Sequence, residues 1–196
     1  RGLDPLFRWT REAARQAWRD AGKNIQGEDT HRGGVILGNL SYPTRSLAEY
    51  AESVWRGEDD RIDAHNRYMS GLPSHLIAQA LGLRGGSFSL DAACASSLYA
   101  IKIACDRLQE GSADVMLAGG THTMLHALGI TGFNRLTALS TFEGDPKKAS
   151  KPFSRDRGGF VMGEGSGMLV LETLDHALAR GATPLAEIVG CYLPYL

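Results

Sequence analysis

Cys94 is the residue of this sequence whose position best suits nucleophilic chemistry. It lies between an alternating, strand-like stretch at 87–93 and a stretch with helical apolar spacing, and its neighbours at 92–97 are all small. Small residues permit a tight strand-to-helix turn, which would place the sulfur near the unpaired N–H groups of the first helical turn. Those groups and the helix dipole favour an anion, so a thiol there ionises more readily and becomes a nucleophile. A backbone N–H beside it could also hold an oxyanion.

The alternative interpretation of Cys94 is structural, because cysteine is often a small buried hydrophobe. Cys105 is expected to be such a residue, since it shares one apolar helix stripe with Leu98, Ile101, Ala104 and Leu108. Cys191 is the third cysteine of the chain. Three scattered cysteines indicate neither a disulfide framework nor a zinc site, and they fit a reducing cytoplasm.

Other candidate sites have plainer explanations. The spaced glycines at 163–167 could suggest a phosphate loop, but a strand rather than a helix follows them, so they predict a tight hairpin. His122 and His126 could share a helix face, yet the residues between them lack the glutamate of a zinc protease. Two polar histidines with satisfied hydrogen bonds are therefore expected. A basic stripe on the first helix is interpreted as a solvated face rather than a docking face, and it comprises Arg8, Arg11, Arg15 and Arg19.

The elements around Cys94 alternate between strand and helix patterns. Asp4 and Pro5 open a helix that Gly22 ends. Further helices are expected at 45–55, 74–81, 98–108, 125–132 and 175–180, and strands at 33–39, 87–93, 114–119, 167–172 and 185–190. A long polar loop at 135–160 separates two of them. This alternation predicts an α/β fold with a mixed or parallel sheet covered on both faces.

Composition narrows the classes of function. The chain has 196 residues, 43% of them hydrophobic and 22% charged, which suits one domain with a real core. The net charge of −1 lends no support to nucleic-acid or membrane binding. No apolar run approaches the length of about 18 residues that a membrane-spanning helix needs.

The string Asp91-Ala92-Ala93-Cys94-Ala95-Ser96-Ser97-Leu98 resembles the active-site signature of the β-ketoacyl synthases, the condensing enzymes of fatty-acid and polyketide synthesis. Later landmarks of that family match in order and spacing. They are DVMLAGG at 114–120, ALS at 138–140, KPF at 151–153, GFVMGEG at 159–165 and RGA at 180–182. The resemblance covers nearly the whole chain.

This resemblance implies a thiolase-like, αβαβα-layered fold and a decarboxylative Claisen condensation. Cys94 would carry the acyl chain as a thioester and its N–H would hold the thioester oxygen, while Phe133 and Phe160 would lie near the cysteine and the acyl channel. The implied partners are an acyl carrier protein, which bears the acyl and malonyl groups, and a second copy paired through the strand Ser87–Leu90. No metal or nucleotide cofactor is expected.

The chain also departs from the family pattern. Residues 1–196 resemble an incomplete N-terminal domain without its first strand, and the two histidine motifs of the family's second half, HGTGT and NxxxxxGH, are absent. The 196 residues alone are therefore not expected to condense. Two alternatives stay open: a thiolase-type acyltransferase, and a non-catalytic fragment that only dimerises or docks a carrier protein.

Overall fold

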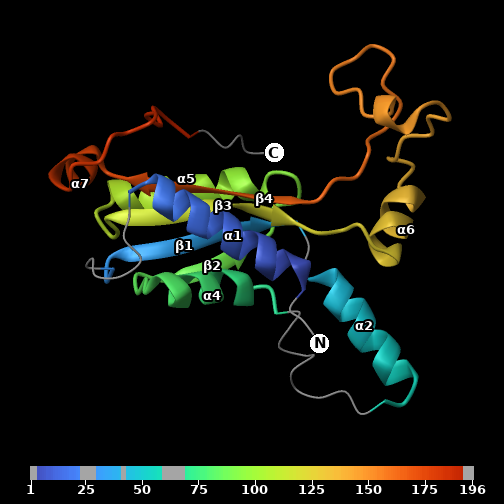
Figure 1. Ribbon diagram of the computed structural model, residues 1–196, viewed down its shortest axis with the longest axis horizontal. Helices are drawn as coiled ribbons and strands as arrows, with labels where there is room; N and C mark the ends of the chain where they lie inside the picture. Colours follow the sequence, from blue (N-terminus) through green and yellow to red (C-terminus); the bar gives the residue numbers. More distant parts are fainter. Residues whose placement is uncertain (1–3, 23–29, 41–42, 59–68, 192–196) are drawn as a thin grey trace.

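The apolar run at 33–39 forms β1 (Gly33–Asn39), a strand in which every residue is buried. The computed structural model describes residues 4–22, 30–40, 43–58 and 69–191. Within these residues β1 lies in a four-stranded sheet of order β2-β1-β3-β4 (Figure 1). Neither face of this strand contacts water, so its sequence is continuously apolar instead of alternating between apolar and polar residues.

The sheet is mixed. β2 (Ser87–Leu90) and β3 (Val115–His122) flank β1 and run parallel to it. β4 (Gly165–Glu172) pairs antiparallel with β3 and closes the other side. The predicted strands at 33–39, 87–93 and 114–119 are confirmed, although the second ends at Leu90 and the third continues to His122.

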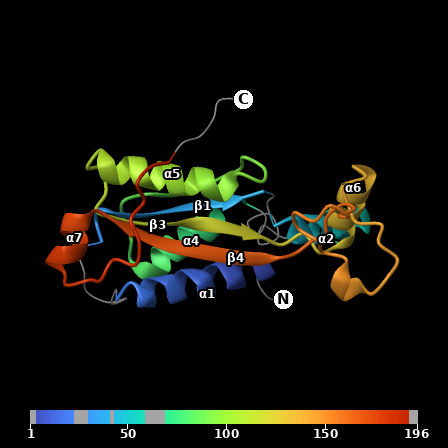
Figure 2. The same ribbon diagram turned by 90° about the horizontal axis from the view of Figure 1, so that it is seen from above.

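Helices cover both faces of the sheet, as the alternating pattern predicts (Figure 2). α1 (Pro5–Asp20) and α4 (Leu72–Leu81) pack on one face, and α5 (Ser96–Gln109) packs on the other. Successive side chains along each strand point to opposite faces of the sheet, so they enter two separate hydrophobic cores. The first core holds the odd-numbered residues Val35, Val115 and Leu117, and the second holds the even-numbered residues Ile36, Met116 and Ala118.

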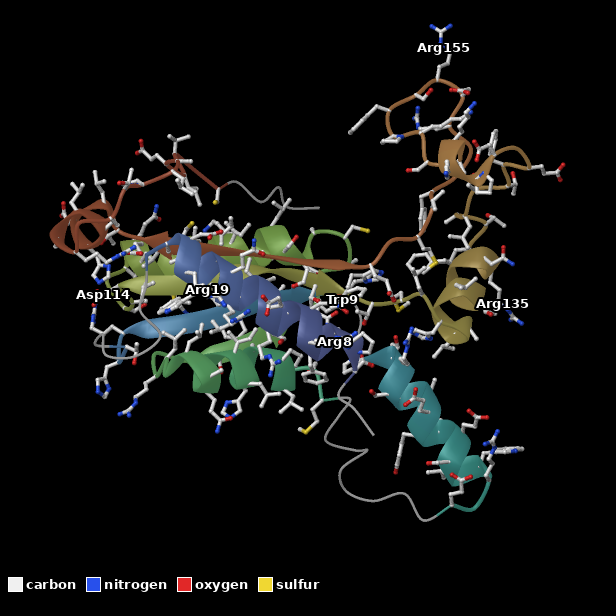
Figure 3. The ribbon with its side chains drawn as sticks, viewed as in Figure 1. Arg8, Trp9, Arg19, Asp114, Arg135 and Arg155 are labelled. Atoms are coloured by element: carbon white, nitrogen blue, oxygen red, sulfur yellow. The ribbon has the colours of Figure 1, made fainter. Side chains whose placement is uncertain are left out.

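The start of α1 confirms its predicted cap. Asp4 Oδ1 accepts a hydrogen bond from the N–H of Leu6 at 3.0 Å, and Pro5 occupies the first helical position. The second oxygen of Asp4 accepts from the Ser46 hydroxyl at 3.0 Å, which ties α1 to α2 (Thr44–Trp55). The arginines of the basic stripe, of which Figure 3 labels Arg8 and Arg19, are exposed.

The face that α5 turns to the sheet differs from the expected stripe. Its buried residues are Ser96, Ala100, Ala104 and Leu108, whereas Leu98 is 62% exposed. Small residues line this face because two strand glycines let the helix approach very closely. A Cβ placed on Gly38 would lie 2.3 Å from the carbonyl carbon of Ser96, and one on Gly120 would lie 2.7 Å from Cβ of Ser97.

Two elements near the end of the chain were predicted wrongly. The glycines at 163–167 form no hairpin, because Gly165 already begins β4 and pairs with His122 at the end of β3. The expected strand at 185–190 is irregular, with Leu185 93% and Val189 90% exposed. A strand needs a partner for its backbone hydrogen bonds, and within the described residues none lies beside this segment.

The helices around the sheet ends complete the fold. α6 (Ala127–Arg135) begins two residues later than expected and leads into the long loop. Figure 1 shows α2, α6 and that loop extending beyond one end of the sheet, and Figure 3 shows Arg155 at the outer tip of the loop. At the other end, α7 (Leu174–Ala179) is tied to β4 through Glu172, which accepts hydrogen bonds from Arg180 and His176 at 2.8 Å each.

Candidate active site

A tight elbow joins β2 to α5, and its own side chains hold it in shape. Asp91 Oδ1 accepts a hydrogen bond from the N–H of Ala93 at 2.8 Å. Ser96 Oγ accepts from the N–H of Ala92 at 2.9 Å and donates to the carbonyl of Ala93 at 2.6 Å. Ala93 has φ +50°, in the left-handed region that non-glycine residues rarely adopt. A strained backbone conformation of this kind persists only where the surrounding structure holds it. Here the hydrogen bonds made by Asp91 and Ser96 hold Ala93 in place.

Cys94 follows the strained residue and carries an exposed, free thiol. It lies two residues before the first residue of α5, at the strand-to-helix turn that the sequence predicts. The N–H groups of Ala95 and Ser96 already donate to the carbonyls of Ala92 and Ala93, at 3.1 Å each. They are therefore not the oxyanion donors, and that role stays a prediction for the N–H of Cys94.

Phe133 and Phe160 lie against each other although 27 positions separate them in the sequence. Their ring centroids are 5.3 Å apart and their planes meet at 85°, an edge-to-face contact. Phe133 belongs to α6, and Phe160 lies where the long loop returns and bridges to Leu139. The structure thus brings the two phenylalanines together. Their expected proximity to Cys94 stays a prediction.

The histidines differ from the expected pair on one helix face. His122 is the last residue of β3, and His126 directly precedes α6. The expectation of satisfied hydrogen bonds is confirmed for His126, whose Nε2 lies 2.7 Å from the Thr44 hydroxyl. It is wrong for His122, whose buried Nδ1 has no hydrogen-bond partner among the described residues. Within the described residues, no group of three or more His, Cys, Asp or Glu side chains lies together in a way that could hold a metal ion.

The other two thiols have different surroundings from Cys94. Cys105 is half-buried rather than fully buried, and burial, together with the neighbouring Cys191, raises its pKa to about 11. At pH 8 only roughly one Cys105 in a thousand would be a thiolate, the form that reacts. Position and exposure thus separate Cys94 from the other cysteines.

Iodoacetamide at pH 8 is therefore expected to label Cys94 first in the folded protein. Peptide mapping by mass spectrometry at low labelling would measure the order of reaction. Cys105→Ala is the matched control and should leave the labelled peptide unchanged. Earlier modification of Cys105 or Cys191 would contradict the assignment of Cys94 as the reactive thiol.

A comparison with models of protein families identifies the family of this chain. Residues 1–177 match the model described as "Beta-ketoacyl synthase, N-terminal domain". The chain belongs to the β-ketoacyl synthase family. The expected resemblance is thereby confirmed, and the Cys94 elbow lies inside the matched region.

Individual relatives agree with the family. The chain is 35% identical to 3-oxoacyl-[acyl-carrier-protein] synthase I, chloroplastic, of Arabidopsis thaliana, over 97% of this chain and 41% of that protein. It is also 35% identical to a putative polyketide β-ketoacyl synthase 1 of Streptomyces halstedii, over 97% of this chain and 47% of that protein. The chain thus spans less than half the length of these curated relatives.

A solved structure confirms the fold. The ketosynthase complex described as "AntDE:AntF (apo): type II PKS acyl-carrier protein in complex with its ketosynthase bound to the hexaketide" aligns with a TM-score of 0.82 and 29% identity, covering 93% of this chain and 47% of that chain. The α/β, thiolase-like fold expected from the resemblance is the fold of this β-ketoacyl synthase domain.

Proposed function

We propose that the complete protein is a β-ketoacyl synthase of fatty-acid or polyketide synthesis, and that residues 1–196 supply its nucleophile as part of the N-terminal domain. The observation that carries the proposal is the exposed Cys94 thiol on a strained elbow within a β-ketoacyl synthase fold. The Streptomyces halstedii relative and the ketosynthase with its carrier protein support the same class of chemistry.

The first half of the reaction uses groups of this chain. The Cys94 thiolate attacks the carbonyl carbon of an acyl thioester on the carrier protein, and the N–H of Cys94 stabilises the resulting oxyanion. Collapse of the tetrahedral intermediate expels the carrier's phosphopantetheine thiolate, which takes up a proton. The acyl group is then a thioester on Cys94.

The second half forms the carbon–carbon bond. A malonyl-type extender on a second carrier loses carbon dioxide, and the electron pair of the broken bond leaves a carbanion. That carbanion attacks the Cys94 thioester carbonyl, and the Cys94 thiolate leaves to give a β-ketoacyl product. The two histidines that assist decarboxylation belong, by the family pattern, to the second half of the complete protein. Phe133 and Phe160 are proposed to line the channel for the acyl chain, since their paired rings offer an apolar surface.

Incubation of the complete protein with acyl and malonyl carrier proteins tests this function. Mass spectrometry should detect the acyl group on Cys94 before malonyl is added, and a β-ketoacyl carrier product afterwards. Acylation from coenzyme A thioesters alone would favour the thiolase-type alternative. Absence of any adduct would favour the non-catalytic alternative, in which the protein only docks a carrier protein or dimerises.

The free edge of β2 supports a proposed homodimer. Within the described residues β2 pairs only with β1, so the opposite edge of Ser87–Leu90 is open to a second copy. Val35 N–H donates to the Gly86 carbonyl at 3.0 Å. In a parallel pair the residues that bond the neighbour alternate, so the N–H and C=O groups of Ser89 are directed to the open edge. Pairing across a twofold axis would join two sheets into one.

Ser89→Pro is expected to convert the dimer of the complete protein to monomer, because proline removes the outward N–H and leaves the hydrogen bonds to β1 in place. Light scattering at micromolar concentration would measure the change. Ser89→Ala is the matched control, since it removes the same 3.2 Å contact to the Ser74 hydroxyl yet keeps the N–H. A monomeric wild type, or a proline variant that stays dimeric, would contradict pairing through β2.

The expected compartment stays a proposal. No helix in the described ranges has the length and apolarity needed to cross a bilayer. We propose a cytoplasmic location because Cys94, Cys105 and Cys191 are free thiols, which a reducing compartment maintains. The Arabidopsis relative is named as chloroplastic.

A further inference from the structure

Cys105 and Cys191 lie far apart in the sequence, yet their thiols share a side-chain hydrogen bond. Cys105 belongs to the body of α5, and Cys191 ends the segment that follows α7. That segment is irregular, and both views show it returning alongside the middle of α5 (Figures 1 and 2). The fold therefore places in contact two thiols that the sequence keeps apart.

A charged pair on α5 lies beside the two thiols. Lys102, Cys105 and Asp106 share one side of the helix, because residues three and four positions apart are neighbours on a helix surface. Lys102 Nζ donates a hydrogen bond to Asp106 Oδ2 at 2.6 Å, and its ammonium is within electrostatic range of both sulfurs. A cation in this place stabilises the sulfur anions that form during thiol–disulfide exchange.

The surroundings of Cys105 determine which thiol reacts first. Burial, together with the neighbouring Cys191, raises the pKa of Cys105 to about 11, so this thiol is protonated at neutral pH. Cys191 is half-buried and is therefore the first nucleophile of the pair. Once Cys191 is in a mixed disulfide it can no longer carry a negative charge. One of the causes that keep Cys105 protonated is then removed.

We propose that Cys105 and Cys191 form a site of reversible oxidation, at which glutathione disulfide or another small-molecule disulfide joins the two sulfurs. Cys191 sulfur attacks one sulfur of the reagent, whose S–S bond breaks and releases one glutathione thiolate. Cys105 sulfur then attacks the Cys191 sulfur of the mixed disulfide and expels the second glutathione thiolate. The protons of the two cysteines pass to the two glutathione thiolates. Two thiols of the protein are thus oxidised, and one glutathione disulfide is reduced.

The new bond would fasten the segment at 185–191 to α5. Leu185 and Val189 of this segment are largely exposed, so a covalent link adds an attachment that their side chains do not provide. In a reducing compartment the thiols are free, as they are here, and disulfides that form there are usually transient and sense the redox state. The pair therefore reports a shift to oxidising conditions.

The test treats the complete protein with millimolar glutathione disulfide at mildly alkaline pH. A Cys94→Ala background removes the exposed thiol that would also react. Digestion without reductant, followed by mass spectrometry, measures which cysteine peptides are joined. Peptides linked through Cys105 and Cys191 should exceed the Cys191 peptide that carries glutathione by about tenfold or more, because thiols held in contact react at a high effective concentration. Dithiothreitol should restore both thiols.

Cys105→Ala in the same background is the matched control. Its Cys191 has no neighbouring thiol and should keep the glutathione. The wild-type protein, treated in the same way, should form the same linked pair, which makes the result independent of how the variants fold. Free thiols at both positions after treatment, glutathione retained on Cys191 of the wild type as in the control, or a link to a different cysteine would each overturn the inference.

Discussion

A Cys94→Ala variant of the complete protein is expected to lose condensation by about a thousandfold or more. The variant lacks the only atom to which the acyl group is proposed to be transferred, and removal of a nucleophile costs far more than removal of a single assisting group. Product formation from acyl and malonyl carrier proteins would measure the loss. The acyl adduct on the protein should vanish at the same time.

Cys105→Ala serves as the control for this experiment. Its thiol is half-buried in the body of α5, with a pKa raised to about 11, so its removal should leave the condensation rate within a few-fold of wild type. Circular dichroism would establish that both variants fold. Retained turnover in the Cys94 variant would show that another residue carries the acyl group.

Gly38→Ala is expected to destabilise the protein by about 3 kcal/mol or more and to abolish acylation of Cys94. The added methyl group would lie 2.3–2.5 Å from three backbone atoms of Ser96 and Ser97. Backbone cannot rotate away as a side chain can, so the start of α5 must shift outward. That shift would break the Ser96 hydrogen bonds that shape the elbow.

Gly167→Ala is the matched control, because this glycine also lies in a strand but has no atom within 4 Å of an added Cβ. It should leave stability within about 1 kcal/mol of wild type. Urea unfolding of the complete protein measures both changes. A Gly38→Ala protein of wild-type stability would mean that α5 lies farther from β1 than the structure shows.

Local signals were sufficient to predict most elements of the fold. Asp4 and Pro5 mark the start of α1, and the apolar run at 33–39 is the central buried strand. The small residues at 92–97 predicted the turn that carries Cys94, and the family motif predicted the fold. These features depend on neighbouring residues, so a sequence displays them directly.

The wrong predictions concern contacts between distant residues. Helical spacing placed Leu98 on the packed face of α5, but the close approach permitted by Gly38 and Gly120 selects the row of small residues instead. The segment at 185–190 has the composition of a strand, yet β-structure requires a partner and none is present within the described residues. The lack of a hydrogen-bond partner for Nδ1 of His122 likewise results from packing between distant residues. The only signal of it in the sequence is the position of His122 near the end of a predicted strand.

The order of the strands in the sheet has a consequence for synthesis on the ribosome. Gly33 of β1 pairs with Val115 of β3, and Val115 pairs in turn with Glu172 of β4. At about 5–20 residues per second, β1 leaves the ribosome several seconds before β3 exists. During that interval β2 and the helices α1, α2 and α4 are the elements among the described residues that can cover its apolar side chains. The nascent chain therefore exposes this apolar strand before its β3 neighbour exists, and a chaperone that holds the strand until β3 emerges should raise the yield of folded protein.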